Sequence, residues 1–241
     1  MNPDEYTRMF EMEDRYWWFV GRRRIALALF DRFRPGGDQF LDLGCGTGVV
    51  LTELGSRGKP VGLDMSPLAL GFCRKRGIER LVRGDATAMP LQTGWAAAII
   101  ALDVFEHIED DGKAFAEAYR SLAPGGILVL SVPAFQSLWG PHDVALMHFR
   151  RYTRRELDAK LVKAGFRIER LSYSVFFLFP IVVIVRFFEK RKKGPAKASL
   201  AALPKWLNGF LIGIQTVEAF LISKLSLPWG SSLIAVARKP E

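Results

Sequence analysis

The sequence has little of what a disulfide scaffold, a zinc module or a secreted precursor needs. Only two cysteines, Cys45 and Cys73, and three histidines occur among 241 residues. Neither residue type has the chain-local spacing of a disulfide framework or a metal site, so we predict free thiols and no bound metal. The first 24 residues contain no apolar run. We therefore expect no signal peptide and a cytoplasmic location.

The charge is unevenly distributed along the chain. The net charge is +9, and residues 181–241 contribute +7 of it, from 10 Lys and Arg against 3 Asp and Glu. The length suits one α/β domain with additions. A nearly neutral body with a basic C-terminal part predicts an anionic partner for that part, either nucleic acid or the cytoplasmic face of a membrane.

A glycine-rich turn follows the first apolar strand that the sequence predicts. Residues 40–43 (Phe-Leu-Asp-Leu) are typical of a short buried strand, and Gly44, Gly46 and Gly48 come directly after it. Glycines let the backbone turn tightly and approach a ligand closely. Residues 49–54 are predicted to be a helix, whose first amides would face that ligand. This arrangement predicts a site for a nucleoside-containing cofactor.

The spacing of the turn indicates which cofactor. The pattern is G-x-G-x-G with an acid two residues earlier, whereas a dinucleotide site needs G-x-G-x-x-G and a P-loop needs a following Gly-Lys. The segment resembles motif I of the class I S-adenosylmethionine (SAM) methyltransferases. This resemblance implies that SAM is the cofactor, bound by Asp42, Gly44, Cys45, Gly46 and Gly48.

Four later segments follow in the order of that family. Asp64 ends an apolar segment about 20 residues after the turn, the offset of a ribose-binding acid. Asp85 lies where the family has its third strand end, residues 103–107 (Asp-Val-Phe-Glu-His) resemble motif IV, and residues 122–131 resemble the helix–turn–strand after it. The resemblance implies further SAM contacts from Asp64, Met65, Asp85, Ala86 and Asp103.

Strands and helices are predicted to alternate along the chain. Strands are expected at 39–43, 60–64, 79–83, 96–101 and 126–132, and helices at 48–57, 67–76 and 112–122. This alternation predicts an α/β fold with a mainly parallel sheet, helices on both faces and ligands at the carboxyl ends of the strands. The resemblance implies a Rossmann-like, seven-stranded sheet whose last strand is antiparallel.

The chain is expected to divide into three parts. Residues 1–35 would form an N-terminal helical cap with one or two helices. Residues 36–174 and 231–241 would form the SAM-binding domain, in which Thr153 and Glu156 fit a capping box and Gly165 ends a helix. The last two strands, 166–173 and 232–238, should pair. The segment between them, residues 175–230, is an insertion relative to the minimal family fold.

The insertion is both apolar and basic. Residues 175–185 have no polar side chain, and Lys190–Lys193 form a basic cluster. Residues 206–227 are apolar but carry Gln215 and Glu218 near the middle. Because a bilayer-spanning helix needs about 20 predominantly apolar residues, the first segment is too short and the second is interrupted.

We therefore expect two helices that lie in the interface of an anionic membrane, with Trp206 and Trp229 at the level of the headgroups. Such contact would make the protein peripheral on the inner face of the membrane. The alternatives are a helical hairpin that covers the core or a dimer interface, and a true membrane span. A homodimer is compatible with the sequence.

His107 is the candidate catalytic residue. It follows motif IV beside the expected methyl donor, and a histidine can act as a general base near neutral pH. A histidine at this place also occurs in the ubiquinone-type methyltransferases that the segment resembles. The alternative role is packing. Trp18 and Arg22 could close over SAM, with Arg22 meeting its carboxylate, or could serve in helix packing.

The loop after the fifth strand is expected to bind the acceptor. It contains His142-Asp143 and the run His148-Phe-Arg-Arg-Tyr152. In this family the loop commonly lines the acceptor pocket, and its charged and aromatic side chains could hold a phosphate or another polar group. Hydrogen bonds from the loop to the core are the alternative. The candidate substrate-binding residues are Trp18, His142, His148, Arg151 and Tyr152, with Arg150 beside them.

The predicted function is methyl transfer from SAM to a small, lipophilic or membrane-delivered acceptor, such as a quinone precursor, a lipid, a lipid-linked sugar or a polyketide-like metabolite. The resemblance, to bacterial type 11 methyltransferases, covers nearly the full chain. RNA methylation is one alternative, but the basic excess lies in an apolar segment and motif IV lacks Asn/Asp-Pro-Pro-Tyr/Phe, which disfavours nucleic acid. A non-catalytic, membrane-associated SAM-fold scaffold is the other.

Overall fold

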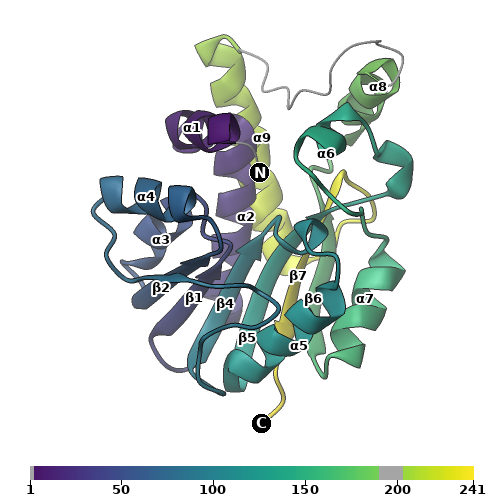
Figure 1. Cartoon of the computed structure of the whole chain (residues 1–241). Coiled ribbons are helices and arrows are strands. Elements are labelled where there is room, and N and C mark those ends of the chain that lie inside the picture. The colour runs from purple at the N-terminus through teal and green to yellow at the C-terminus, as the bar shows by residue number, and fades with distance from the viewer. Residues whose placement is uncertain (1–2, 190–202) are drawn as a thin grey trace.

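A seven-stranded sheet forms the centre of the protein (Figure 1). The computed structural model describes residues 3–189 and 203–241. The strand order is β3-β2-β1-β4-β5-β7-β6, and β7 runs antiparallel to both of its neighbours, β5 and β6. The predicted fold class is therefore confirmed. The strands are β1 (Gln39–Leu43), β2 (Lys59–Asp64), β3 (Leu81–Arg83), β4 (Ala96–Leu102), β5 (Leu122–Pro133), β6 (Arg167–Ser174) and β7 (Ser232–Arg238).

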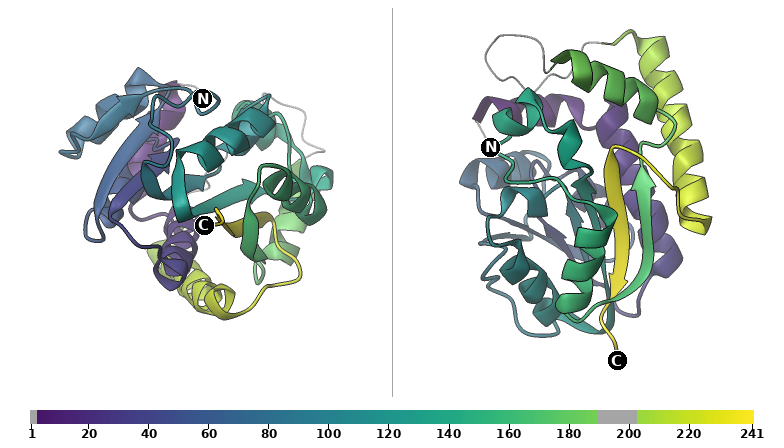
Figure 2. Two further views of the ribbon diagram at one scale, coloured as in Figure 1. Left: turned by 90° about the horizontal axis from the view of Figure 1, so that it is seen from below. Right: turned by 90° about the vertical axis from the view of Figure 1, so that its right-hand side faces the viewer.

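Helices cover both faces of the sheet, as the view from below shows (Figure 2). One face packs against α5 (Asp111–Ser121) and α7 (Arg154–Lys163), and the other against α2 (Trp17–Phe33), α3 (Val49–Leu54) and α9 (Lys205–Lys224). Every residue of β4 is buried. This explains why β4 is a continuous apolar run without polar alternation, as expected for a central parallel strand.

Several predicted boundaries were wrong by a few residues. The helix after the glycine turn ends at Leu54 because Gly55 closes it, three residues before the predicted end. β5 begins at Leu122, four residues early, since Leu122 pairs with Ala96 before a register shift. The capping box of α7 is confirmed, because the Glu156 amide donates to Thr153 Oγ1 over 3.2 Å and Glu156 Oε2 accepts from the Thr153 amide over 2.8 Å.

The segment before the sheet forms two helices, α1 (Pro3–Met12) and α2, and α4 (Pro67–Lys75) lies beneath α1. Two short elements, η2 (Gln136–Leu138) and α6 (Pro141–Ala145), follow β5. The parallel strands end at one edge of the sheet, and α1 and α6 lie over that edge (Figure 1). A ligand at the carboxyl ends of the strands would therefore lie beneath these helices.

The insertion between β6 and β7 contains α8 (Phe179–Glu189) and α9, which runs beside α2 (Figures 1 and 2). Ala219 and Ile222 of α9 belong to the same core cluster as Phe30 of α2. This part of the insertion covers the core, as one of the alternatives predicted. The Lys190–Lys193 cluster lies outside the described residues. The division of the chain into three functional parts stays a prediction.

The two faces of α9 differ in an unexpected way. Gln215 and Glu218 point into the protein, where Glu218 is fully buried and accepts hydrogen bonds from the amides of Val175 and Phe176, the latter over 3.0 Å. The outer face is apolar and exposed, with Trp206, Phe210, Val217 and Phe220. The carboxylate that argued against a membrane span therefore does not interrupt the outer face. Within the described part of the chain, α9 alone has the length and composition to cross a membrane.

We predict that Glu218 anchors the insertion. Replacing it with alanine leaves two buried amides without an acceptor, so Glu218→Ala should lower the free energy of unfolding by about 2–4 kcal/mol. The neighbouring Val217→Ala, on the exposed face, is the matched control and should change it by less than about 0.5 kcal/mol. Urea denaturation measures both, and equal effects of the two substitutions would contradict the anchoring role.

Candidate cofactor and acceptor site

The candidate site lies where the carboxyl ends of β2, β1 and β4 meet. β1 pairs with β2 on one side and with β4 on the other, so the connections after β1 and β4 leave the sheet in opposite directions. In open α/β sheets ligands bind in the crevice that such a divergence creates. Gly44 follows β1, Asp64 ends β2 and Asp103 follows β4, which confirms the predicted meeting of these strand ends.

The glycine loop and Asp64 form one hydrogen-bonded unit. The amides of Gly46 and Ser66 donate to the Asp64 carboxylate over 3.0 and 2.8 Å, and the Gly44 amide donates to the Leu63 carbonyl over 2.8 Å. The φ angles of Gly44, Gly46 and Gly48 are 66°, 53° and 92°, a left-handed conformation that side chains disfavour. The three glycines are therefore required by the backbone of the loop itself.

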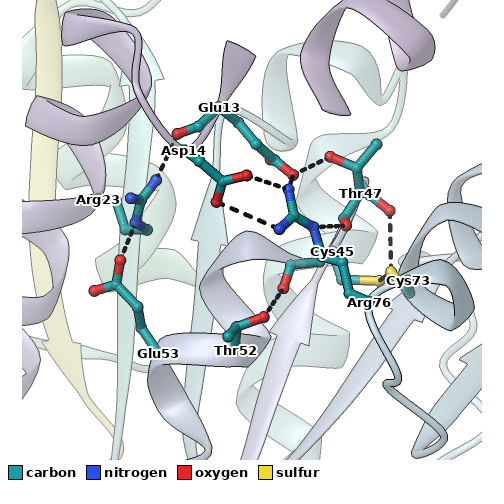
Figure 3. Close-up of polar contacts among 11 residues, drawn as sticks. Glu13, Asp14, Arg23, Cys45, Thr47, Thr52, Glu53, Cys73 and Arg76 are labelled. Carbon is teal, nitrogen blue, oxygen red and sulfur yellow. Dashed lines mark hydrogen bonds and ion pairs between the residues drawn. The ribbon is translucent and has the colours of Figure 1, made fainter. Parts of the chain in front are cut away.

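Helix α1 covers this loop. A Cβ atom at Gly46 would come within 2.7 Å of the Met9 methyl group. Glu13, which is 3% exposed, accepts hydrogen bonds from Thr47 Oγ1 and from Arg76 Nη2, the latter over 2.8 Å (Figure 3). Arg76 also pairs with Asp14. These contacts could not be predicted from the sequence, because Glu13 and Arg76 lie 63 residues apart and match no motif.

Buried carboxyl groups dominate the electrostatics of the cofactor side. Asp42 is 3% exposed, and its Oδ2 has no hydrogen-bond partner among the described residues. Burial raises the pKa of Asp42 well above its usual range, and the charges of Asp64 and Glu13 add to this. Burial also raises the pKa of Asp64. A ligand with positive charge and hydroxyl donors would satisfy these groups, and SAM, with its ammonium, sulfonium and ribose hydroxyls, fits that requirement.

Arg22 reaches the site from α2 and pairs with Asp103. Arg22 Nη1 donates to Asp103 Oδ2, and Ser131 Oγ donates to Asp103 Oδ1 over 2.7 Å. Burial alone would raise the pKa of Asp103, but the Arg22 charge and the Ser131 hydrogen bond hold it below its usual range. The predicted contact of Arg22 with the SAM carboxylate stays a prediction. Trp18 lines a small cavity beside Arg22.

The predicted adenine-side residues lie farther out, near the β2–β3 edge. Asp85 is exposed, and its carboxylate accepts from the amide and hydroxyl of Thr87 over 2.8 and 2.9 Å. Met65 is 69% exposed. Ala86 is partly buried against the core.

Cys45 is buried in the glycine loop, and its Sγ lies 3.9 Å from that of Cys73. Cofactor contact by Cys45, Met65, Asp85 and Ala86 stays a prediction.

Two of the three histidines meet beside Asp103. His107 lies on the 3-10 turn η1 (Phe105–His107) and its ring centroid is 4.6 Å from that of His148. Glu106 is fully buried, and neither of its carboxylate oxygens has a partner within the part of the chain that is described. One of these oxygens and one ring nitrogen of each histidine lie within 4.8 Å of one another. These atoms could hold a cation, which chain-local spacing did not reveal.

A buried ion pair holds the acceptor loop. Arg151 Nε and Nη2 donate to both oxygens of Asp143 over 2.8 and 3.0 Å, and Asp143 Oδ1 lies 3.1 Å from His148 Nδ1. Tyr152 is buried, and its hydroxyl donates to Asp111 Oδ2 over 2.7 Å. Arg151 and Tyr152 thus make the loop-to-core contacts that were the alternative role. His142 lies in α6, and burial lowers its pKa to about 4. Acceptor binding stays a prediction for His142, His148, Arg151 and Tyr152.

Comparison with known proteins agrees with this geometry. The chain is 28% identical over 163 residues to a probable S-adenosylmethionine-dependent methyltransferase of Mycolicibacterium smegmatis, covering 65% of this chain and 62% of that one. It is 30% identical over 145 residues to a ubiquinone biosynthesis O-methyltransferase of Xanthomonas oryzae pv. oryzae, covering 54% and 61%. The chain spans about half to three fifths of the length of the curated relatives it matches.

The same fold occurs in a solved structure from Thermotoga maritima, a SAM-dependent methyltransferase described as a possible histamine N-methyltransferase. The TM-score is 0.62 at 19% identity, with 98% of this chain and 95% of that chain covered. At this identity the likeness concerns the fold alone. Residues 41–130 match the family model Methyltransf_11, described as a methyltransferase domain. The chain therefore has the fold of the class I SAM-dependent methyltransferases, and its residues 41–130 match a methyltransferase domain.

Proposed function

We propose that this protein transfers a methyl group from SAM to a small, lipophilic or membrane-delivered acceptor. The observation that carries the proposal is the Asp64 carboxylate, which is held against the glycine loop by the amides of Gly46 and Ser66. This geometry presents an acid and a set of positive-φ glycines at the same end of the sheet, as a nucleoside cofactor requires. The name of the relative from Mycolicibacterium smegmatis, a probable S-adenosylmethionine-dependent methyltransferase, agrees with this choice of methyl donor.

Residues from the ends of β1 and β2 and from α2 would bind different parts of SAM. When bound, SAM supplies an activated methyl group on its sulfonium. Asp64 would accept hydrogen bonds from the ribose hydroxyls, Asp42 would face the cationic part, and Arg22 would meet the carboxylate. The glycine loop would let the backbone approach the cofactor. The remaining task of the protein is to orient the acceptor and exclude water.

Asp64→Ala should weaken SAM binding by roughly tenfold to a hundredfold, because it removes charge-assisted hydrogen bonds to the ribose. Isothermal titration calorimetry with SAM and with S-adenosylhomocysteine measures the effect. Asp38→Asn is the matched control, since Asp38 lies before β1 at the opposite end of the sheet and pairs with Lys59. Wild-type affinity in folded Asp64→Ala would contradict the proposed cofactor site. No binding of either ligand by the folded wild type would favour a scaffold.

His107 stays the candidate base, in a neutral form. Burial lowers its pKa to about 4, and the nearby His148 contributes. A neutral imidazole can accept a proton, but one with so low a pKa is a weak base near neutral pH. His107 therefore suits an acceptor whose proton is already acidic, or an acceptor that needs only positioning.

The ring of His107 should not titrate between about pH 8 and pH 5. In the unfolded chain its pKa is about 6.5, so the unfolded state binds the proton first. This group should therefore cost the protein stability as the pH falls from about 6.5 towards 4. A ¹H–¹³C NMR titration of the histidine rings, with His107→Gln to assign the signal, should give a midpoint below about 5. A midpoint near the unfolded value would contradict the burial argument.

We also propose that the insertion touches an anionic membrane. The support is the exposed apolar face of α9, together with α8, on which Ile181, Ile184, Phe187 and Phe188 are each more than half exposed. Contiguous apolar surface of this kind marks an interaction site. The basic residues of the C-terminal part would add electrostatic attraction to anionic lipid. An acceptor dissolved in the membrane would then lie near the site.

The triple variant Trp206→Ser, Phe210→Ser, Phe220→Ser should recover roughly tenfold less protein than wild type in flotation with phosphatidylglycerol-containing vesicles, because it removes three exposed aromatic side chains. Val162→Ser, an exposed apolar residue of α7 outside the insertion, is the control and should float as wild type. Equal recovery of wild type with and without vesicles would refute membrane contact and leave the dimer interface as the role of this face.

A further inference from the structure

We propose that a small cavity between α2, α9 and the ends of β5, β6 and β7 binds one neutral oxygen of the acceptor, carbonyl or phenolic, with Gln215 and Arg22 as the donors. This inference rests on the proposed methyl transfer and names the class of acceptor for the same site. It also gives α9 a direct part in recognition.

The cavity lies beside the expected point of methyl transfer. Trp18 and Arg22 of α2, Ser131 of β5, Ser174 of β6 and Gln215 of α9 line it, and its volume is about 10 Å³. Arg22 and Ser131 are the two residues that bind Asp103, the residue after β4. The cavity has room for a single oxygen atom, either of a water molecule or of a ligand.

Two buried donors point to an oxygen as the occupant. Gln215 is 2% exposed, and its Nε2 has no hydrogen-bond partner in the described ranges. Arg22 Nε is likewise buried and lacks an acceptor among the residues that the structure describes. Buried nitrogens of this kind are nearly always hydrogen-bonded. An oxygen with two lone pairs would accept from both.

The charges around the cavity favour a neutral oxygen. The Arg22 guanidinium is paired with Asp103 and, under the proposed function, would also meet the carboxylate of SAM, so a further carboxylate in the cavity would have no cation of its own. The amide of Gln215 is a neutral donor. The rest of the lining consists of the apolar side chains of Trp18, Ile25, Val175 and Ile234 and of three neutral serines, Ser131, Ser174 and Ser232. The subsite therefore suits the carbonyl or phenolic oxygen of an otherwise apolar acceptor.

The position of Gln215 depends on Gly21. A Cβ atom at Gly21 would come within 2.6 Å of Gln215 Cγ. Position 21 of α2 therefore needs a residue without a side chain, so that the Gln215 side chain can pack across the helix. The glutamine thereby reaches the cavity from α9. This contact explains why an apolar helix carries an amide at this position, which membrane contact alone does not.

A matched pair of probes tests the subsite. We expect 4-fluoroacetophenone to bind wild type about five- to tenfold more tightly than 1-ethyl-4-fluorobenzene, which lacks the oxygen, in a ¹⁹F NMR titration. In Gln215→Met, whose unbranched side chain has similar length, the ratio should fall at least twofold toward one, with Arg22 Nε still able to donate. Thr216→Val, the exposed neighbour, should keep the wild-type ratio.

A ratio near one in wild type would overturn the proposal without reference to any variant. An unchanged ratio in folded Gln215→Met would also overturn it, because the preference for the oxygen would then not depend on Gln215. Calorimetry with SAM separates this inference from the proposed function. Intact SAM binding with no preference for the ketone would refute the subsite alone, whereas absence of SAM binding in wild type would refute the methyltransferase proposal.

Discussion

In the central sheet β1 lies between β2 and β4, and the connections that follow β1 and β4 diverge at the carboxyl edge. The register aligns Asp42 of β1 with Gly62 of β2 and Ile100 of β4. The glycine loop, the Asp64 carboxylate and the Arg22–Asp103 pair therefore converge at one place. Each later feature depends on this pairing, since α1, the acceptor loop and the small cavity all surround the same edge.

Helix α9 takes part in both proposals, membrane contact and acceptor binding. Its inner face carries Glu218, which holds the start of the insertion, and Gln215, which reaches the cavity. Its outer face is apolar and exposed from Trp206 to Phe220. Because a helix places residues three and four apart on one side, both polar groups can turn inward together and leave the outer face without charge. Under the two proposals, the same helix would contact a membrane with one face and the acceptor with the other.

The sequence predicted the features that depend on local chemistry. The glycine turn, Asp64, the antiparallel last strand and the capping box of Thr153 follow from spacing, turn chemistry and the family resemblance. The contacts between Glu13 and Arg76, and between His107 and His148, could not be predicted, because they join residues far apart in sequence that match no motif. Gln215 was visible only as an interruption in an apolar segment. The role proposed for Gln215 became apparent only from the packing of α9 against Gly21 of α2.

The central claim is that SAM binds in the crevice between the ends of β1, β2 and β4. Hydrogen–deuterium exchange with and without saturating SAM tests it most directly, because backbone amides of the glycine loop would become protected by the cofactor. The account predicts slower exchange at residues 44–48, 64–66 and 103–107, with no change at the opposite edge of the sheet. Unchanged exchange at residues 44–48 in the presence of bound SAM would contradict it.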